Sequence, residues 1–156
     1  MPRSGNSSLV FPLSGVRLFR RYQEFNFDYY ELEVIDYISN LGGSFFFHMH
    51  NAPMNGIGTY TIDESTGMTD IDGFEHNYIH RNVYDKLTNS FQKYVSFPNS
   101  GSFTITRLSQ NPLTGTIISG TFSCRVRNIN NPNDEIEITK GRFDINSLTI
   151  AGTYFP

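Results

Sequence analysis

Four histidines occur in two short clusters, and imidazole is a common metal ligand as well as a proton carrier near neutral pH. His48 and His50 lie two residues apart in FFFHMH, and His76 and His80 lie four apart in EHNYIH. On a strand, residues two apart share a face, so the first pair would lie side by side. A zinc site would need about three or four of these histidines to converge on the ion. The alternative, which spacing alone favours, is that the first pair occupies a solvated or edge face and the second a polar loop.

The segment DESTGMTDIDGFE is acidic and supplies the oxygen ligands that calcium prefers. It does not follow the spacing of an EF-hand. If Asp70 and Asp72 were the inner ligands before Gly73, the first ligand position would be Met68 and the last Ile79. A solvated loop rich in turn formers is the simpler interpretation.

The residues that could catalyse hydrolysis form no recognisable motif. The chain has no G-x-S-x-G segment, and Cys124 alternates with apolar residues that face the core, where a thiol is inert. Glu31 and Glu33 could form the carboxylate pair of a glycosidase, but they fall on the outward face of an expected strand. We therefore expect no enzymatic activity and no cofactor.

A basic cluster of Arg17, Arg20 and Arg21 precedes the aromatic segment YQEFNFDYY, and interleaved arginine and aromatic side chains can stack on sugar rings or bases. The net charge of -3 excludes a general nucleic-acid binder, which needs a basic face. We expect exposed tyrosines here to contact a glycan or a protein partner. The residues of this expected binding surface are Arg20, Arg21, Tyr22, Tyr29 and Tyr30. The alternative is that the tyrosine rings pack at the rim of the fold with their hydroxyls in water.

The elements that must position these side chains are expected to be strands. Fourteen Phe and nine Tyr favour pleated surfaces, and turn residues recur every 8–12 or so positions, as in sandwiches and barrels. The expected strands are Val16–Gln23, Tyr29–Tyr37, Ser44–His50, Gly58–Asp63, Phe91–Phe97, Ser102–Leu108, Thr116–Arg127, Glu135–Ile145 and Leu148–Tyr154. A short helix is conceivable only over Asn77–Ser90, which could equally be strand and loop.

The strictest alternation spans Gly120–Ile145. Phe122, Cys124 and Val126 share the inward face with Ile136 and Ile138, while the polar residues between them face outward. The segment NINNPND joins the two strands as a hairpin.

Two further features of this hairpin can be predicted. Arg125 and Arg127 should lie across from Glu135 and Glu137. The apolar parity then shifts, so an extra residue must be absorbed near Lys140-Gly141, where glycine can adopt positive φ in a β-bulge.

We therefore predict one all-β domain over residues 16–156, preceded by a flexible leader over residues 1–15. The expected architecture is an antiparallel meander that forms a β-sandwich or a flattened, lipocalin-like barrel, with at most one short helix. The single cysteine excludes an intrachain disulfide, and no apolar run is long enough for a membrane helix.

Four motifs resemble those of an uncharacterised family of envelope lipoproteins from Bacteroidota, a domain of unknown function. They are G-x-Y-x-[IL] at Gly58–Ile62, G-x-[IF]-x-I-T at Gly101–Thr106, I-S-G-T-F at Ile118–Phe122 and I-T-x-G-x-F-D at Ile138–Asp144. The resemblance implies an all-β fold and export to the periplasm or the outer-membrane surface. It transfers no catalytic residues. If the protein is attached to a membrane, we expect the attachment to be an N-terminal lipid anchor that has been removed from this sequence.

Three hypotheses on function follow. The first is a non-catalytic cell-envelope domain that binds a protein partner or a glycan. The second is a carrier of a small apolar ligand, which needs an open apolar cavity of roughly 300 Å³ or more. The third is a metal-dependent enzyme, which requires His48, His50 and one of the other two histidines to meet.

Overall fold

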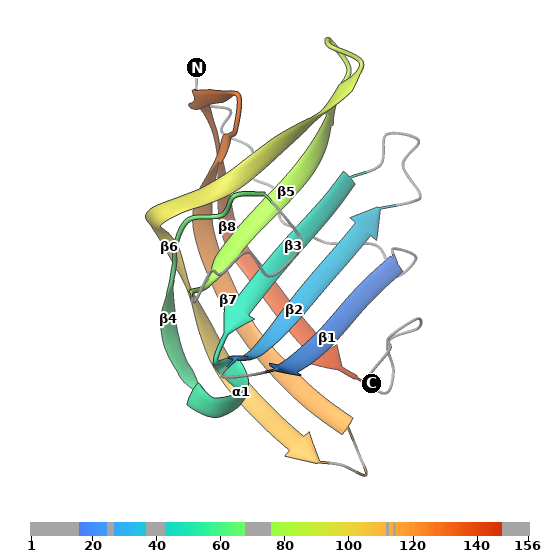
Figure 1. Cartoon of the computed structure of the whole chain (residues 1–156), viewed down its shortest axis with the longest axis vertical. Coiled ribbons are helices and arrows are strands. Elements are labelled where there is room, and N and C mark those ends of the chain that lie inside the picture. The colour runs from blue at the N-terminus through green and yellow to red at the C-terminus, as the bar shows by residue number, and fades with distance from the viewer. Residues whose placement is uncertain are drawn as a thin grey trace.

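A computed structural model describes residues 16–24, 27–36, 43–67, 76–111, 113 and 115–147 (Figure 1). Three expected segments lie outside this range: the leader over residues 1–15, residues 68–75 of the acidic segment, and the last strand over residues 148–154. So do the side chains of Arg20, Arg21 and Tyr22, although their backbone belongs to a strand.

The described chain is almost entirely antiparallel β-sheet, which confirms the predicted all-β meander with at most one short helix; that helix lies at Ala52–Asn55 and not within Asn77–Ser90. The elements are β1 (Val16–Glu24), β2 (Phe27–Asp36), β3 (Gly43–His50), α1 (Ala52–Asn55), β4 (Gly58–Ile62), β5 (Tyr78–Asp85), β6 (Ser90–Asn111), β7 (Gly115–Asn128) and β8 (Asn131–Asn146). Their order in the sheet is β1-β2-β3-β5-β6-β7-β8, with β4 paired to β6. Two expected strands are fused in β6, and the ambiguous segment is strand β5. Within the described ranges, no helix has the length and apolar character needed to cross a membrane.

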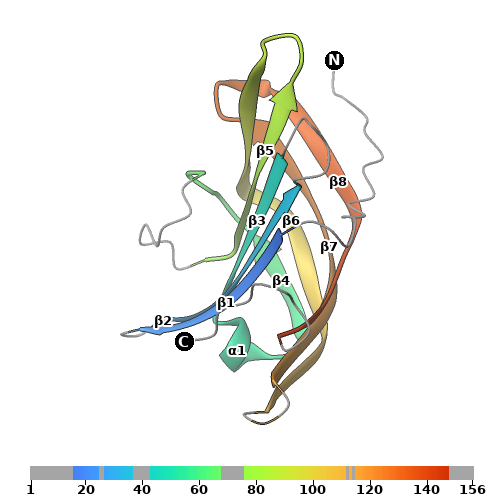
Figure 2. The same ribbon diagram turned by 90° about the vertical axis from the view of Figure 1, so that its right-hand side faces the viewer.

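The sheet curls around its core without closing into a barrel (Figure 2). Its register shifts within β6 between Ser96 and Gly101, where the strand changes direction. The first part of β6 pairs with β5, whereas the second part pairs with β4. Among the described residues, the end strands β1 and β8 pair with one neighbour each, so the closed-barrel alternative is wrong.

Aromatic side chains from both parts of the curled sheet fill its interior. The rings of Phe45 and Phe47 on β3 lie 5.6 and 5.5 Å from that of Phe122 on β7, measured between centroids. Phe143 on β8 lies 6.0 Å from Phe47 in an edge-on contact. Each buried ring contributes about 1.5–3 kcal/mol by leaving water, so these contacts hold the two parts of the sheet together.

The β7–β8 hairpin follows its predicted alternation and contains the predicted bulge. Phe122 pairs with Gly141 and Cys124 with Ile138, so two residues of β8 lie opposite one of β7. The positive φ belongs to Lys140, at 55°, and not to Gly141 as expected. Gly141 is required for space instead, because a Cβ atom there would lie 2.5 Å from the Phe122 ring.

The predicted charge pairs of this hairpin are also present. Arg125 pairs with Glu137 and Arg127 with Glu135 in the strand register. The ion pair itself is diagonal, with 3.6 Å between Arg125 and Glu135.

Candidate functional site

Polar and aromatic side chains form a second buried layer on the face of β2, β3 and β5 that points away from the core. On β3, Phe45, Phe47 and Met49 face the core, so the residues between them face outward. The strand register aligns them with outward residues of β2 and β5. This outer layer consists of Tyr29, Glu31, Phe46, His48, Tyr78 and His80, each at most 2% exposed. A solvated face for His48 and Glu31, and a polar loop for His80, were therefore wrong expectations.

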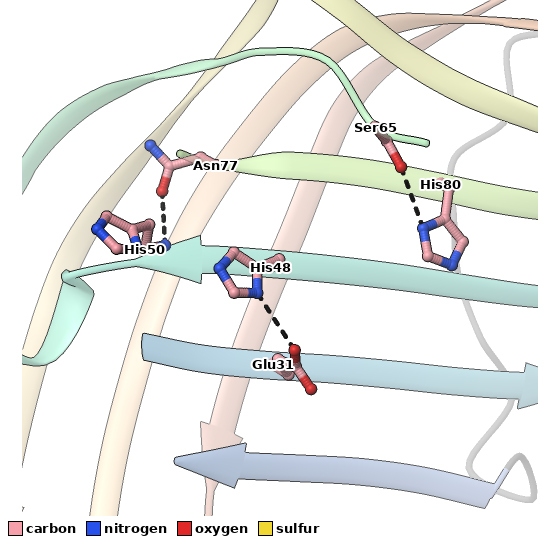
Figure 3. Close-up of polar contacts among 6 residues, drawn as sticks. All are labelled: Glu31, His48, His50, Ser65, Asn77 and His80. Carbon is pink, nitrogen blue, oxygen red and sulfur yellow. Dashed lines mark hydrogen bonds and ion pairs between the residues drawn. The ribbon is translucent and has the colours of Figure 1, made fainter. Parts of the chain in front are cut away.

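His48 and Glu31 form the most constrained polar contact of the outer layer (Figure 3). Nδ1 of His48 lies 3.2 Å from Oε1 of Glu31. The imidazole lies between the rings of Tyr29 and Tyr78, with both centroids 4.6 Å away. Within the described chain, Nε2 of His48 has no hydrogen-bond partner. The carboxylate and the two rings thus fix the orientation of the imidazole.

His80 occupies a separate part of the layer, against Phe46 and Ser65 (Figure 3). Its ring stacks on Phe46 at 4.7 Å, and its Nδ1 lies 3.3 Å from Oγ of Ser65. Burial, and secondarily the positive charge of Lys93, lowers the pKa of His80 from 6.5 to about 4. His80 is therefore a neutral, structural histidine at neutral pH.

The four histidines do not converge. His48 and His50 share a face, as predicted, with 6.3 Å between ring centroids. The Nε2 of His76 donates a hydrogen bond to the carbonyl oxygen of Glu64 at 2.7 Å, and His80 is engaged as described above. Across the described part of the chain, no group of three or more His, Cys, Asp or Glu could hold a metal ion. The predicted metal site thus lacks the geometry that it requires.

Two residues of the predicted binding surface, Tyr29 and Tyr30, have described side chains, and neither is exposed. Tyr29 and Tyr30 are fully buried, so the expectation that they are exposed is wrong. Tyr30 belongs to the hydrophobic core, whereas Tyr29 packs on His48 in the outer layer. Adjacent strand residues point to opposite faces, and here both faces of β2 are covered. In the strand register Tyr22, Arg21 and Arg20 lie opposite Tyr29, Tyr30 and Glu31.

Cys124 is buried in the core, at 4% exposure, as the alternation predicts. Burial raises the pKa of its thiol to about 12, so the reactive thiolate is not formed at neutral pH.

A site that the sequence reasoning did not identify lies on the outer face of β4, β6 and β7. Two rows of hydroxyl side chains cross these three strands in register, about 4.8 Å apart from one strand to the next. The rows are Thr61, Ser102 and Ser123, and Thr59, Thr104 and Thr121. We call these six residues the hydroxyl face. Their signal in the sequence is a hydroxyl residue at every second position of GTYTI, SFTIT and SGTFS.

A hollow of about 300 Å³ lies over part of the hydroxyl face. It is lined by Ser102, Thr104, Thr121, Phe122, Ser123 and Lys140. The polar lining and outward position distinguish this hollow from the apolar interior cavity that a carrier would need. Arg142 lies opposite Thr121 in the register and continues the second row onto β8.

Comparison with protein families, with characterised proteins and with solved structures finds no match to this chain.

Proposed function

We propose that the chain is a non-catalytic binding domain of the cell envelope that recognises a glycan on its hydroxyl face. The observation that carries the proposal is the pair of hydroxyl rows that border the hollow of about 300 Å³. A serine or threonine hydroxyl both donates and accepts hydrogen bonds, as sugar hydroxyls do. The paired strands hold these groups in place before a ligand arrives, which lowers the entropic cost of binding.

Location in the envelope is supported by the family resemblance of the strands that build this face. Thr59 and Thr61 belong to the Gly58–Ile62 motif, Ser102 and Thr104 to Gly101–Thr106, and Thr121 to Ile118–Phe122. A domain exported to the periplasm or the outer-membrane surface would meet glycans there.

Binding is a better match to this face than catalysis. Among the described residues that line the hollow there is no histidine or carboxylate, so none of them provides a base to activate its hydroxyls. The Glu31–His48 pair lies in the buried outer layer of β2 and β3, and both side chains are almost fully shielded from a substrate.

The test is a double substitution, Thr104→Val with Thr121→Val, assayed on a glycan array and then by calorimetry on the best ligand. Valine keeps the branched shape and the strand preference of threonine and removes the hydroxyl. At position 104 this also removes the 2.8 Å contact between the hydroxyls of Thr104 and Thr59. Losing two hydrogen bonds of about 0.5–1.5 kcal/mol each should weaken binding by about five- to 150-fold.

The matched control is Thr88→Val in the exposed β5–β6 turn, which should bind as the wild type does. Wild-type affinity in the double variant, with an unchanged melting temperature, would rule out the hydroxyl face as the binding site.

A protein partner remains the second candidate, and the β5–β6 hairpin favours it. This hairpin projects beyond the rest of the sheet (Figure 1), and it carries Leu87 at 90% and Phe91 at 57% exposure. Exposed apolar side chains at a projecting tip are typical of protein contacts. A partner isolated from envelope extracts should be retained by the wild type and lost by a Leu87→Ser, Phe91→Ser variant.

A further inference from the structure

We propose that the ligand of the hydroxyl face is an acidic glycan and that Lys140 and Arg142 bind its anionic group. This inference rests on the proposed function and narrows its ligand class. It follows from the backbone of the β8 bulge, the charges around the hollow and the extent of the hydroxyl rows.

Lys140 occupies a backbone conformation that disfavours its own residue type. Its φ of 55° is in the left-handed region, where a side chain with a Cβ atom is strained. A bulge can redirect a side chain, and Lys140 here contributes to the wall of the hollow. Strain of this kind at a lysine that borders a hollow is typical of a functional position.

The adjacent Gly141 cannot exchange roles with Lys140. A side chain at position 141 would collide with the Phe122 ring, so the glycine is fixed by packing. The left-handed conformation of the bulge therefore falls on position 140. Glycine at position 140 would relieve the strain, and the chain has a lysine there instead.

The charges around the hollow are unbalanced. Lys140 and Arg142 are both exposed, and in the described part of the chain neither forms an ion pair. By contrast, Arg125 on the same hairpin has Glu135 within 3.6 Å.

None of the described residues that line the hollow carries a carboxylate. On β8, Asp144 lies two residues from Arg142, and its Oδ1 accepts a hydrogen bond from Ser119 at 2.6 Å. Lys140 and Arg142 therefore border the hydroxyl face as cations without an ion-pair partner among the described residues. This arrangement is complementary to a carboxylate or sulfate group.

The extent of the hydroxyl rows favours an acidic glycan over a simple anion as the ligand. A free phosphate would engage Lys140 and one or two neighbouring hydroxyls, but the rows continue across β6 to Thr59 and Thr61 on β4. A ligand that matches the whole face must carry many hydroxyls as well as a charge. Two cations in a chain of net charge -3 are too few for a nucleic-acid backbone.

The experiment uses a panel of uronate, sialylated and sulfated oligosaccharides, each with its neutral parent sugar, and inorganic phosphate as a competitor. The acidic form should bind about tenfold more tightly than its neutral parent, since hydrogen bonds to charged groups are worth about 1.5–3 kcal/mol. Lys140→Gln should remove this preference and reduce the dependence of binding on sodium chloride. Lys140→Gly should bind as Lys140→Gln does and melt at a higher temperature than the wild type.

The matched control is Lys86→Gln, which removes the same charge from the exposed β5–β6 turn and should retain the preference. Equal binding of acidic and neutral sugars, unaffected by Lys140→Gln, would overturn this inference and leave the proposed function standing. Full displacement by millimolar phosphate, or tighter binding of an RNA oligonucleotide than of any sugar, would also overturn it. If no sugar on the panel binds, both this inference and the proposed function fail.

Discussion

The outer faces of the two parts of the sheet differ in what covers them. On β6 and β7, residues that point away from the core, such as Thr121 and Arg125, are exposed to water. On β2, β3 and β5, residues in the equivalent orientation, such as Phe46 and His48, are almost fully buried. The same alternation of side chains thus produces a one-sided strand in one part and a two-sided strand in the other.

This difference separates the roles of polar residues in the two parts. A buried polar group must be satisfied by a partner, and Glu31 and Ser65 contact the two buried histidines in this way. An exposed hydroxyl is satisfied by water and can exchange that water for a ligand. Substitutions in the buried outer layer should therefore change stability more than substitutions on the exposed face.

Phe46→Ala should destabilise the protein by about 3–5 kcal/mol, as truncation of a core aromatic residue does. Phe46 stacks on His80 and Tyr78 and is 2% exposed. The matched change on the exposed face, Thr121→Ala, should stay within about 0.5 kcal/mol. Urea denaturation measures both values, and a loss below about 1 kcal/mol for Phe46→Ala would contradict the buried outer layer.

Stability should fall on acidification because of His80. Its pKa is about 4 in the folded protein and 6.5 when unperturbed, so between these values the unfolded chain binds a proton that the folded one does not. The stabilisation is complete above pH 6.5 and decreases as the pH falls towards 4, by about 3 kcal/mol.

Thermal unfolding across this pH range measures the effect. His80→Phe, which keeps a ring against Phe46, should flatten the pH profile. His76→Phe, at a half-buried position, should retain the decrease. An unchanged profile in His80→Phe would assign the decrease to other groups.

Glu31→Ala should cost about 2–3 kcal/mol, because it removes the acceptor that Nδ1 of His48 contacts and leaves a buried imidazole without it. The control is Glu137→Ala on β8, an exposed glutamate whose removal should be nearly neutral. Chemical denaturation of both variants at pH 7 provides the comparison. Equal effects would mean that the two carboxylates experience similar solvation.

Lys140→Gly should stabilise the protein by about 1 kcal/mol, the smallest of the four effects, because glycine adopts positive φ without strain. Differential scanning calorimetry would detect the rise in melting temperature. A decrease would indicate that the lysine side chain stabilises the bulge by contacts of its own.

The sequence was sufficient to predict the β7–β8 hairpin, because one face of the hairpin is buried and the other is exposed to solvent. There the alternation alone identified Phe122, Cys124 and Ile138 as buried and placed the bulge correctly. It could not say whether Lys140 or Gly141 would carry the positive φ. That choice depends on the Phe122 ring, which occupies the space beside Gly141.

The outer layer could not be predicted, because burial on a second face depends on what packs over it. Tyr29 and His48 belong to polar alternations of the same kind as those of exposed strands. Strand β5 was ambiguous for a different reason. Ile79 and Val83 lie four residues apart, a spacing that places side chains on one face of a helix and also on one face of a strand.

The hydroxyl face could not be predicted from the sequence, because alternating serine and threonine also fit an ordinary solvent-exposed strand face. Its meaning depends on alignment of three strands that are far apart in the sequence. Only the register between Thr59, Thr104 and Thr121 converts them into one surface.

The burial of Cys124 has a consequence for how the folded protein responds to oxidants. Because the thiol stays protonated and enclosed in the folded state, two folded molecules cannot form a disulfide through it, and glutathione cannot react with it. Only a chain that has lost the β6–β7–β8 packing presents a reactive sulfur. An oxidant would therefore modify the thiol of misfolded molecules and leave that of folded molecules unmodified.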